Sequence, residues 1–115
     1  MTPEQTVVFI QILDQHTVLG FNDETSMVLD LGEGAKVEIR ADGSQSWFLN
    51  GQQHRTDGPA VIWANGSQSW WLNGQQHRTD GPAEIYADGS QRWFLNGERM
   101  TQTKHTAAVR KLRAA

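Results

Sequence analysis

Apolar and polar residues follow a regular pattern through the middle of the chain. Short runs rich in Trp, Phe, Leu, Ile and Val are separated by Asp-Gly or Asn-Gly pairs, as at Asp42-Gly43 and Asn50-Gly51. Such pairs accept the positive φ that two-residue hairpin turns require. The pattern predicts a mainly β protein, an antiparallel meander of stacked β-hairpin repeats that forms a single twisted sheet.

The pattern recurs with a period of 23 residues. Residues 41–60 and 64–83 agree at eighteen of twenty positions, and a third copy at 87–97 then diverges. A fixed period of this length is typical of stacked supersecondary units, none of which buries its apolar face alone. We therefore expect one repeat domain over residues 36–100.

A further break in the first two units contains proline, at Asp57-Gly58-Pro59 and at Asp80-Gly81-Pro82. Proline has no N–H to donate to a ladder of strand hydrogen bonds. We therefore expect it at the first residue of a strand or at a bulge.

Successive residues of a strand point to opposite sides of a sheet. One side carries positions that do not change between the copies, and we name it the constant face. Its residues are Trp47, Trp70 and Trp93, Leu49, Leu72 and Leu95, and Ile39, Ile62 and Ile85. We expect them to form a buried ladder in which like side chains stack from one unit to the next.

The opposite side, which we name the variable face, carries positions that differ between copies. Ser46 and Ser69 become Arg92 in the third copy, and Glu38 becomes Val61 in the second. Positions that tolerate such changes are expected to face water.

The variable face is also rich in aromatic residues. Exposed aromatic side chains beside arginine are typical anchors of protein interfaces. The candidate partner-binding residues are Phe48, Trp63, Trp71, Tyr86, Arg92 and Phe94. In the alternative interpretation, the terminal segments fold over this face and turn it into a second core.

The segment 1–35 precedes the repeats and is expected to pack on the sheet. Thr2-Pro3 is typical of a helix start, which predicts a helix over about residues 3–15, with a strand as the alternative. Two apolar runs separated by a polar turn predict a hairpin within residues 17–35.

The net charge of −3 is unevenly distributed. Residues 1–35 hold six acids and no Lys or Arg, whereas residues 101–115 hold four bases and no acid. This basic segment forms either a helix over 103–114 or a frayed tail. The acidic segment is either ordinary solvated surface or a region that meets a basic partner. A pI of 5.7 argues against direct nucleic-acid binding by the body of the protein.

Composition argues against several other classes of protein. Hydrophobic residues make up 37% of the chain and the mean hydropathy is −0.58, so no membrane span is expected. The run Val7–Ile10 lacks a basic leader, and we expect no secretory signal. The absence of cysteine excludes disulfides, thiolate metal sites and a cysteine nucleophile.

The strongest candidates for chemistry lie in the repeated sequence QQHRTDG, where His54 precedes Asp57 and His77 precedes Asp80. Imidazole and carboxylate are competent ligands for a divalent metal. Each unit offers only one of each, however, and Asp commonly satisfies backbone groups in turns. We therefore expect these residues to be structural, with no metal, cofactor or catalytic residue, and the protein not to be an enzyme.

The repeat resembles MORN repeats, in the variant form LNGxxHRxDGPA found in phage and large-virus proteins. The resemblance covers about residues 36–100 and rests on LNGQQHRTDGPA, which occurs twice. His54-Arg55-Thr56-Asp57 stands where His-Gly-x-Gly is usual, and the Tyr-x-Gly-x-Trp signature is missing. The resemblance implies a twisted single-layer sheet of hairpins that contacts proteins or lipids, and it carries no catalytic residues.

These features favour a non-enzymatic protein-binding repeat module. One specific form of this hypothesis is a phage or mobile-element protein, cytoplasmic in the host cell, that docks on and blocks a host defence protein. The acidic segment would then mimic nucleic acid. The alternative is a module that binds cell wall, carbohydrate or choline through Trp63, Trp71 and Tyr86. The open edges of a meander also make a homodimer an expectation.

Overall fold

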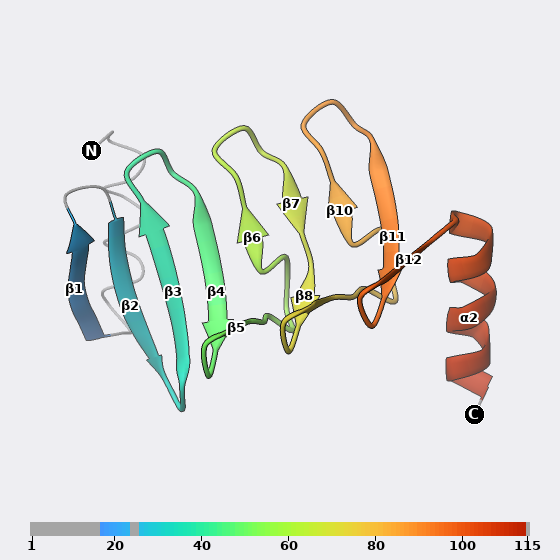
Figure 1. The fold of residues 1–115 in the computed structure, drawn as a ribbon, viewed down its shortest axis with the longest axis horizontal. Coiled ribbons are helices and arrows are strands. Elements are labelled where there is room, and N and C mark those ends of the chain that lie inside the picture. Colours follow the sequence, from blue (N-terminus) through green and yellow to red (C-terminus); the bar gives the residue numbers. More distant parts are fainter. Residues whose placement is uncertain (1–16, 24–25, 115) are drawn as a thin grey trace.

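The computed structural model describes residues 17–23 and 26–114, which form an open antiparallel sheet followed by helix α2 (Gln102–Ala114) (Figure 1). The helix expected over residues 3–15 lies outside this range. The strands are β1 (Thr17–Asp23), β2 (Ser26–Gly32), β3 (Ala35–Arg40), β4 (Gln45–Leu49), β5 (Gln52–Gln53), β6 (Val61–Ile62), β7 (Gln68–Ser69), β8 (Trp71–Leu72), β9 (Gln75–Gln76), β10 (Glu84–Ile85), β11 (Gln91–Leu95) and β12 (Glu98–Met100).

Neighbouring strands follow one another in chain order, β1-β2-β3-β4-β6-β7-β10-β11-β12. Strand β5 pairs with β4, and β8 pairs with β9 in a separate two-stranded ladder. The predicted antiparallel meander is therefore confirmed. The hairpin predicted within residues 17–35 is present as β1 and β2, and the basic C-terminal segment forms a helix.

The two turns of each unit differ in length. Asn50 has a φ of 50° and the glycine after it one of 82°, the pair of positive values that a two-residue type I′ turn requires. At the Asp-Gly site, the Gly43 N–H donates to the Arg40 carbonyl (3.0 Å) and the Arg40 N–H donates to the Ser44 carbonyl (2.9 Å). This is a three-residue loop with a glycine bulge, so the prediction of a two-residue turn there is wrong. The Asp42 carboxylate stabilises the longer loop by accepting the Ser44 N–H at 2.8 Å.

Several repeat strands contain only two residues and are shorter than the apolar runs that predicted them. The reason is a change of pairing partner within each run. The Trp47 N–H donates to the carbonyl of Ala60, which directly precedes β6 (2.7 Å), whereas Phe48 pairs with Gln53 in β5. Each apolar run therefore passes from one ladder into another, and in the second unit β7 and β8 are separated in the same way.

The strand register places like residues in one row across the constant face. Directly opposite residues along this row are Met27, Ile39, Gln45, Ile62, Gln68, Ile85 and Gln91. The buried apolar cluster lies where this face meets β2 and β3, and it contains Met27, Leu29, Val37 and Ile39, with Leu31 and Trp47 packed against it. A row of branched side chains and glutamine stems stabilises a single sheet through cross-strand contacts.

The predicted burial of the constant face is only partly correct. Ile39 and Leu95 are buried, but the three tryptophans Trp47, Trp70 and Trp93 are half-buried. The long sheet of the described residues is a single layer, and the indoles on it keep part of their surface exposed.

The prediction that the serine positions of the variable face see water is wrong. Ser46 is 7% exposed and Ser69 is 0% exposed, and Val61 between them in the sheet is also buried. Small side chains in the middle of the sheet are covered by larger neighbours. The indole Nε1–H of Trp71, for example, donates to the Ser69 hydroxyl at 2.7 Å. Arg92, at the third equivalent position, is exposed as expected.

Candidate functional site

Two loops of identical sequence connect consecutive units, and we name them the HRTDGP loops (residues 54–59 and 77–82). Each loop is tied to both of the units that it connects. The His54 N–H donates to the Trp47 carbonyl of its own unit (3.1 Å), and the next N–H, of Arg55, donates to the Trp71 carbonyl of the following unit (3.0 Å). The loop is thus part of the interface between units rather than a free connection.

The arginine of each loop packs on the constant face. The guanidinium carbon of Arg55 lies 3.9 Å from the centroid of the Trp47 ring, and that of Arg78 lies 3.8 Å from the centroid of Trp70. Each loop therefore covers one of the half-buried tryptophans with a cation–π contact.

The same guanidinium closes the loop on itself. Arg55 donates through Nε to the Asp57 carboxylate at 2.9 Å and through Nη1 to the Pro59 carbonyl at 3.1 Å. Arg78 repeats both bonds with its own aspartate and proline, at 2.8 and 3.1 Å. These hydrogen bonds hold the pKa of Asp57 and of Asp80 below the usual value.

The histidine of each loop joins its unit to the next one. Nδ1 of His54 accepts the backbone N–H of Asn73, and Nδ1 of His77 accepts that of Asn96, both at 2.9 Å. The two asparagines have positive φ values of 50°, so the imidazole fixes the turn of the following unit. An accepting Nδ1 requires the neutral imidazole that carries its proton on Nε2. Burial, followed by the nearby His105, lowers the pKa of His77 and favours this form.

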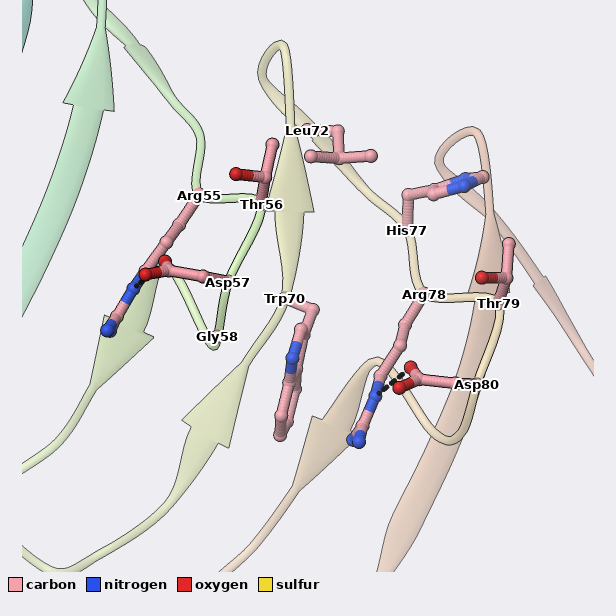
Figure 2. Close-up of a pocket in the computed structure, with 10 residues that line it drawn as sticks. All are labelled: Arg55, Thr56, Asp57, Gly58, Trp70, Leu72, His77, Arg78, Thr79 and Asp80. Carbon is pink, nitrogen blue, oxygen red and sulfur yellow. Dashed lines mark hydrogen bonds and ion pairs between the residues drawn. The ribbon is translucent and has the colours of Figure 1, made fainter.

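A groove of about 470 Å³ lies between the two loops. Figure 2 shows that Arg55 and Arg78 point the same way, each with its aspartate beside it, and that Trp70 lies against Arg78. The prediction that these loop residues satisfy backbone groups is confirmed for the histidines and arginines. The aspartates fix the loop differently, because each accepts a hydrogen bond from the arginine side chain of its own loop.

Helix α2 takes over where a third HRTDGP loop would begin. Thr101 occupies the position equivalent to Arg55, and its hydroxyl accepts the Lys104 N–H at 3.2 Å as the helix cap. The buried His105 donates from Nε2 to the Arg78 carbonyl at 2.6 Å. With Val109 and Trp93, His105 lines a small hollow between α2 and the sheet, so the helix covers the constant face at its C-terminal end.

Neither the HRTDGP loops nor α2 covers the variable face, where the predicted partner-binding residues lie. Trp63 is 42% exposed, Phe48, Trp71 and Tyr86 are half-buried, and Phe94 is buried at 9% exposed. Phe94 therefore offers little surface to a partner. Residues 1–16, the other segment considered as a cover for this face, lie outside the described residues.

Three residues of the variable face form a cluster at its third-copy end. The Arg92 guanidinium carbon lies 5.1 Å from the centroid of the Tyr86 ring. The Tyr86 hydroxyl donates to the Glu84 carboxylate, which also accepts from the side-chain amide of Gln76. The bond to Glu84 raises the pKa of Tyr86, and the positive charges of Arg92 and Arg99 act against this rise.

At the first-copy end, the variable face is hollowed around Phe48. This groove of about 440 Å³ is lined by Val28, Gly34, Lys36, Glu38, Phe48, Asn50 and Gly51. Lys36 pairs directly with Phe48 across β3 and β4. Sequence comparison of the copies missed Lys36 and Arg99, because neither lies in the repeated motif. The signal that finds them is the register, which places Lys36 opposite Phe48 and Arg99 opposite Phe94.

Two structural findings concern metals and membranes. In residues 17–23 and 26–114, no group of three His, Asp or Glu side chains is placed to hold a metal ion. Within the same part of the chain, no helix has both the length and the apolar character needed to span a membrane.

Comparison with known proteins gives no match to this chain, either among protein-family models, among curated proteins or among solved structures. The resemblance to MORN repeats therefore stays a prediction from the motif.

Proposed function

We propose that the chain is a non-enzymatic protein-binding module that presents the variable face to its partner. The observation that carries this proposal is that the two faces of the sheet differ in what covers them. The constant face is occupied by the HRTDGP loops and α2. The variable face is left open by them, differs from copy to copy, and exposes Trp63 at the end of β6, where the chain enters the turn to β7.

The composition of the variable face supports a protein partner. Aromatic residues and arginine are enriched at the centres of protein interfaces, where they supply most of the binding energy. The units are also rigidly joined, because every connection carries the same set of backbone and histidine hydrogen bonds. A surface held rigid before binding loses little conformational entropy when the partner docks.

The charge distribution supports a more specific form of this function, in which the chain binds a host defence protein and blocks it. Residues 1–35 carry six acids and no base. A segment with this charge would be attracted to the basic channel of an enzyme that handles nucleic acid, and this attraction would weaken with salt.

The test is affinity capture from bacterial lysate with the wild-type chain and two variants. Trp63→Ala removes an exposed aromatic of the variable face. Leu112→Ala removes a large apolar side chain elsewhere, on α2, which is 57% exposed. We expect one protein to be retained by wild type and by Leu112→Ala but lost with Trp63→Ala, since hot-spot aromatics contribute about 2 kcal/mol or more.

Two results count against the proposal. Capture that is equal with all three proteins would show that the variable face is not the binding surface. Saturable quenching of tryptophan fluorescence by cell-wall fragments or choline, lost in Trp63→Ala, would instead favour the carbohydrate- or choline-binding alternative.

A further inference from the structure

The C-terminal end of the molecule carries most of its positive charge. Residues 91–115 contain the six bases Arg92, Arg99, Lys104, Arg110, Lys111 and Arg113, and the single acid Glu98, for a net charge of +5. The whole chain has a net charge of −3, so the remaining residues carry −8. Strands β11 and β12 and helix α2, which contain these bases, lie together at one end of the molecule (Figure 1). The third-copy end of the variable face is therefore in the positive part of a protein that is otherwise acidic.

Arg92 and Arg99 are the two of these cations that the register places on the variable face. Arg92 is opposite Glu84 and Arg99 is opposite Phe94, and both arginines are exposed. Neither forms an ion pair with a carboxylate in the described part of the chain. This sets them apart from Arg55 and Arg78, which are each bound to an aspartate.

The carboxylate opposite Arg92 in the sheet, that of Glu84, is already engaged. Both oxygens of Glu84 accept hydrogen bonds from neutral donors, the Tyr86 hydroxyl and the Gln76 amide. Glu84 is half-buried, whereas Arg92 and Arg99 are exposed. The result is an exposed surface with two guanidinium groups and an aromatic ring. Guanidinium N–H groups bind a carboxylate, and the ring can contact an apolar side chain next to that carboxylate.

We propose that the cluster of Tyr86, Arg92 and Arg99 binds an acidic segment of a partner protein, with Trp63 and Trp71 contacting apolar side chains of the same segment. This inference rests on the proposed protein-binding function and names the chemistry of the partner. Nucleic acid fits less well, because the other ninety residues carry a net charge of −8 and would repel an extended polyanion.

The experiment selects binders from a random peptide library on the immobilised full chain and measures the best of them by fluorescence polarisation. We expect the selected peptides to be rich in Asp or Glu beside apolar residues. Replacing their acids by Asn or Gln should weaken binding about tenfold, and so should Arg92→Glu or Arg99→Glu, as is usual when one partner of a charged contact is lost.

Lys111→Glu is the matched control, because it makes the same change of charge at an exposed position on α2. It should weaken binding no more than about twofold, as expected of long-range charge alone. A peptide in which the acids are replaced by Lys should regain affinity for Arg92→Glu. Such a gain would also show that the variant is folded.

Each remaining outcome overturns the inference in a recognisable way. Peptides that lose affinity for Trp63→Ala but bind equally well without their acids would support the protein-binding function and contradict an acidic partner. Equal losses in Arg92→Glu and Lys111→Glu would reduce the effect to net charge. Tighter binding of oligo(dT) than of any peptide would show that the site binds nucleic acid. Self-association of the wild-type chain that disappears in Arg92→Glu would show that the site binds a second copy of the chain. A library without Trp63-dependent binders would remove both proposals.

Discussion

At the scale of single residues, the histidine, arginine and aspartate side chains of each HRTDGP loop make different contacts. Arginine covers an indole and closes the loop, aspartate neutralises the arginine, and histidine receives a backbone N–H from the next unit. The residues that surround the arginine leave little room. A Cβ on Gly81 would lie 3.0 Å from the guanidinium carbon of Arg78, so a larger residue there would push the arginine away from its ring.

The accepting histidine makes stability depend on pH. The pKa of His77 is lower in the folded chain than its ordinary value of 6.5, so the unfolded chain binds more protons between the two values. The free energy of unfolding should therefore be constant above about pH 6.5 and fall as the pH drops below it. Urea denaturation between pH 7.5 and 5 measures this fall in the free energy of unfolding. A separate loss of stability is expected at lower pH, near pH 4, about where Asp57 and Asp80 titrate in the unfolded chain.

The matched variant is His77→Asn, whose side-chain oxygen can still accept the Asn96 N–H but does not titrate. Its stability should fall less between pH 6.5 and 5 than that of wild type, because one titrating group has been removed. An unchanged slope would mean that other groups cause the pH dependence. His77→Ala removes the acceptor altogether and should cost about 0.5–1.5 kcal/mol at neutral pH, since the hydrogen bond that fixes the exposed turn at Asn96 is lost.

At the scale of the elements, helix α2 replaces a repeat loop. The third copy has Thr101 where the first two have arginine, so the loop arginine that covers Trp47 and Trp70 has no counterpart at Trp93. The helix supplies the missing cover with His105 and Val109, which are 3% and 6% exposed. Repeat proteins need such terminal elements, because the last unit has no neighbour on which to bury its inner face.

This role predicts different effects of one substitution at two positions of α2. Val109→Asp places a charge against the sheet and should destabilise the protein by about 2–4 kcal/mol, because a carboxylate at a position only 6% exposed loses most of its hydration. Leu112→Asp, at a position 57% exposed, should change stability by less than about 0.5 kcal/mol. Thermal unfolding followed by circular dichroism compares the two, and equal effects would contradict the capping role.

At the scale of the whole molecule, the sheet is a row of interchangeable units. The two HRTDGP loops make the same backbone hydrogen bonds to the units that they connect. The bond from the histidine N–H is 3.1 Å long in both loops, and the bond from the arginine N–H to the following unit differs by 0.3 Å. Stability in such a row is close to a sum of unit and nearest-neighbour contributions.

Deletion of residues 53–75 tests this additivity, because it removes one full period and joins Gln52 to Gln76 with the motif intact. The shortened chain should fold with the same type of circular dichroism spectrum and a lower midpoint in urea. Deletion of residues 53–74 is the control. It leaves one extra residue before the histidine, reverses the faces of the following strand and should not give a folded protein. Equal stability of the two shortened chains would argue against a register-dependent interface.

The candidate surface was predicted in part, and the errors share one cause. Comparing the copies identified the variable face, the exposure of Arg92 and the exposed Trp63. It did not reveal that Phe94 is buried or that Ser69 lies under the Trp71 indole. Whether a side chain is covered depends on neighbours that are distant in sequence, and a comparison of equivalent positions contains no information about them.

The sequence by itself determined what local chemistry controls: the period of the units, the Asn-Gly turns with their positive φ, and which residues share a face. Only the tertiary structure decided the partner change at Trp47, the stacking of Arg55 on that indole, and the hydrogen bond from the Asn73 backbone to His54. The first group depends on torsion angles and on alternation within a few residues. The second group joins atoms of different units, and these atoms meet only when the sheet has formed.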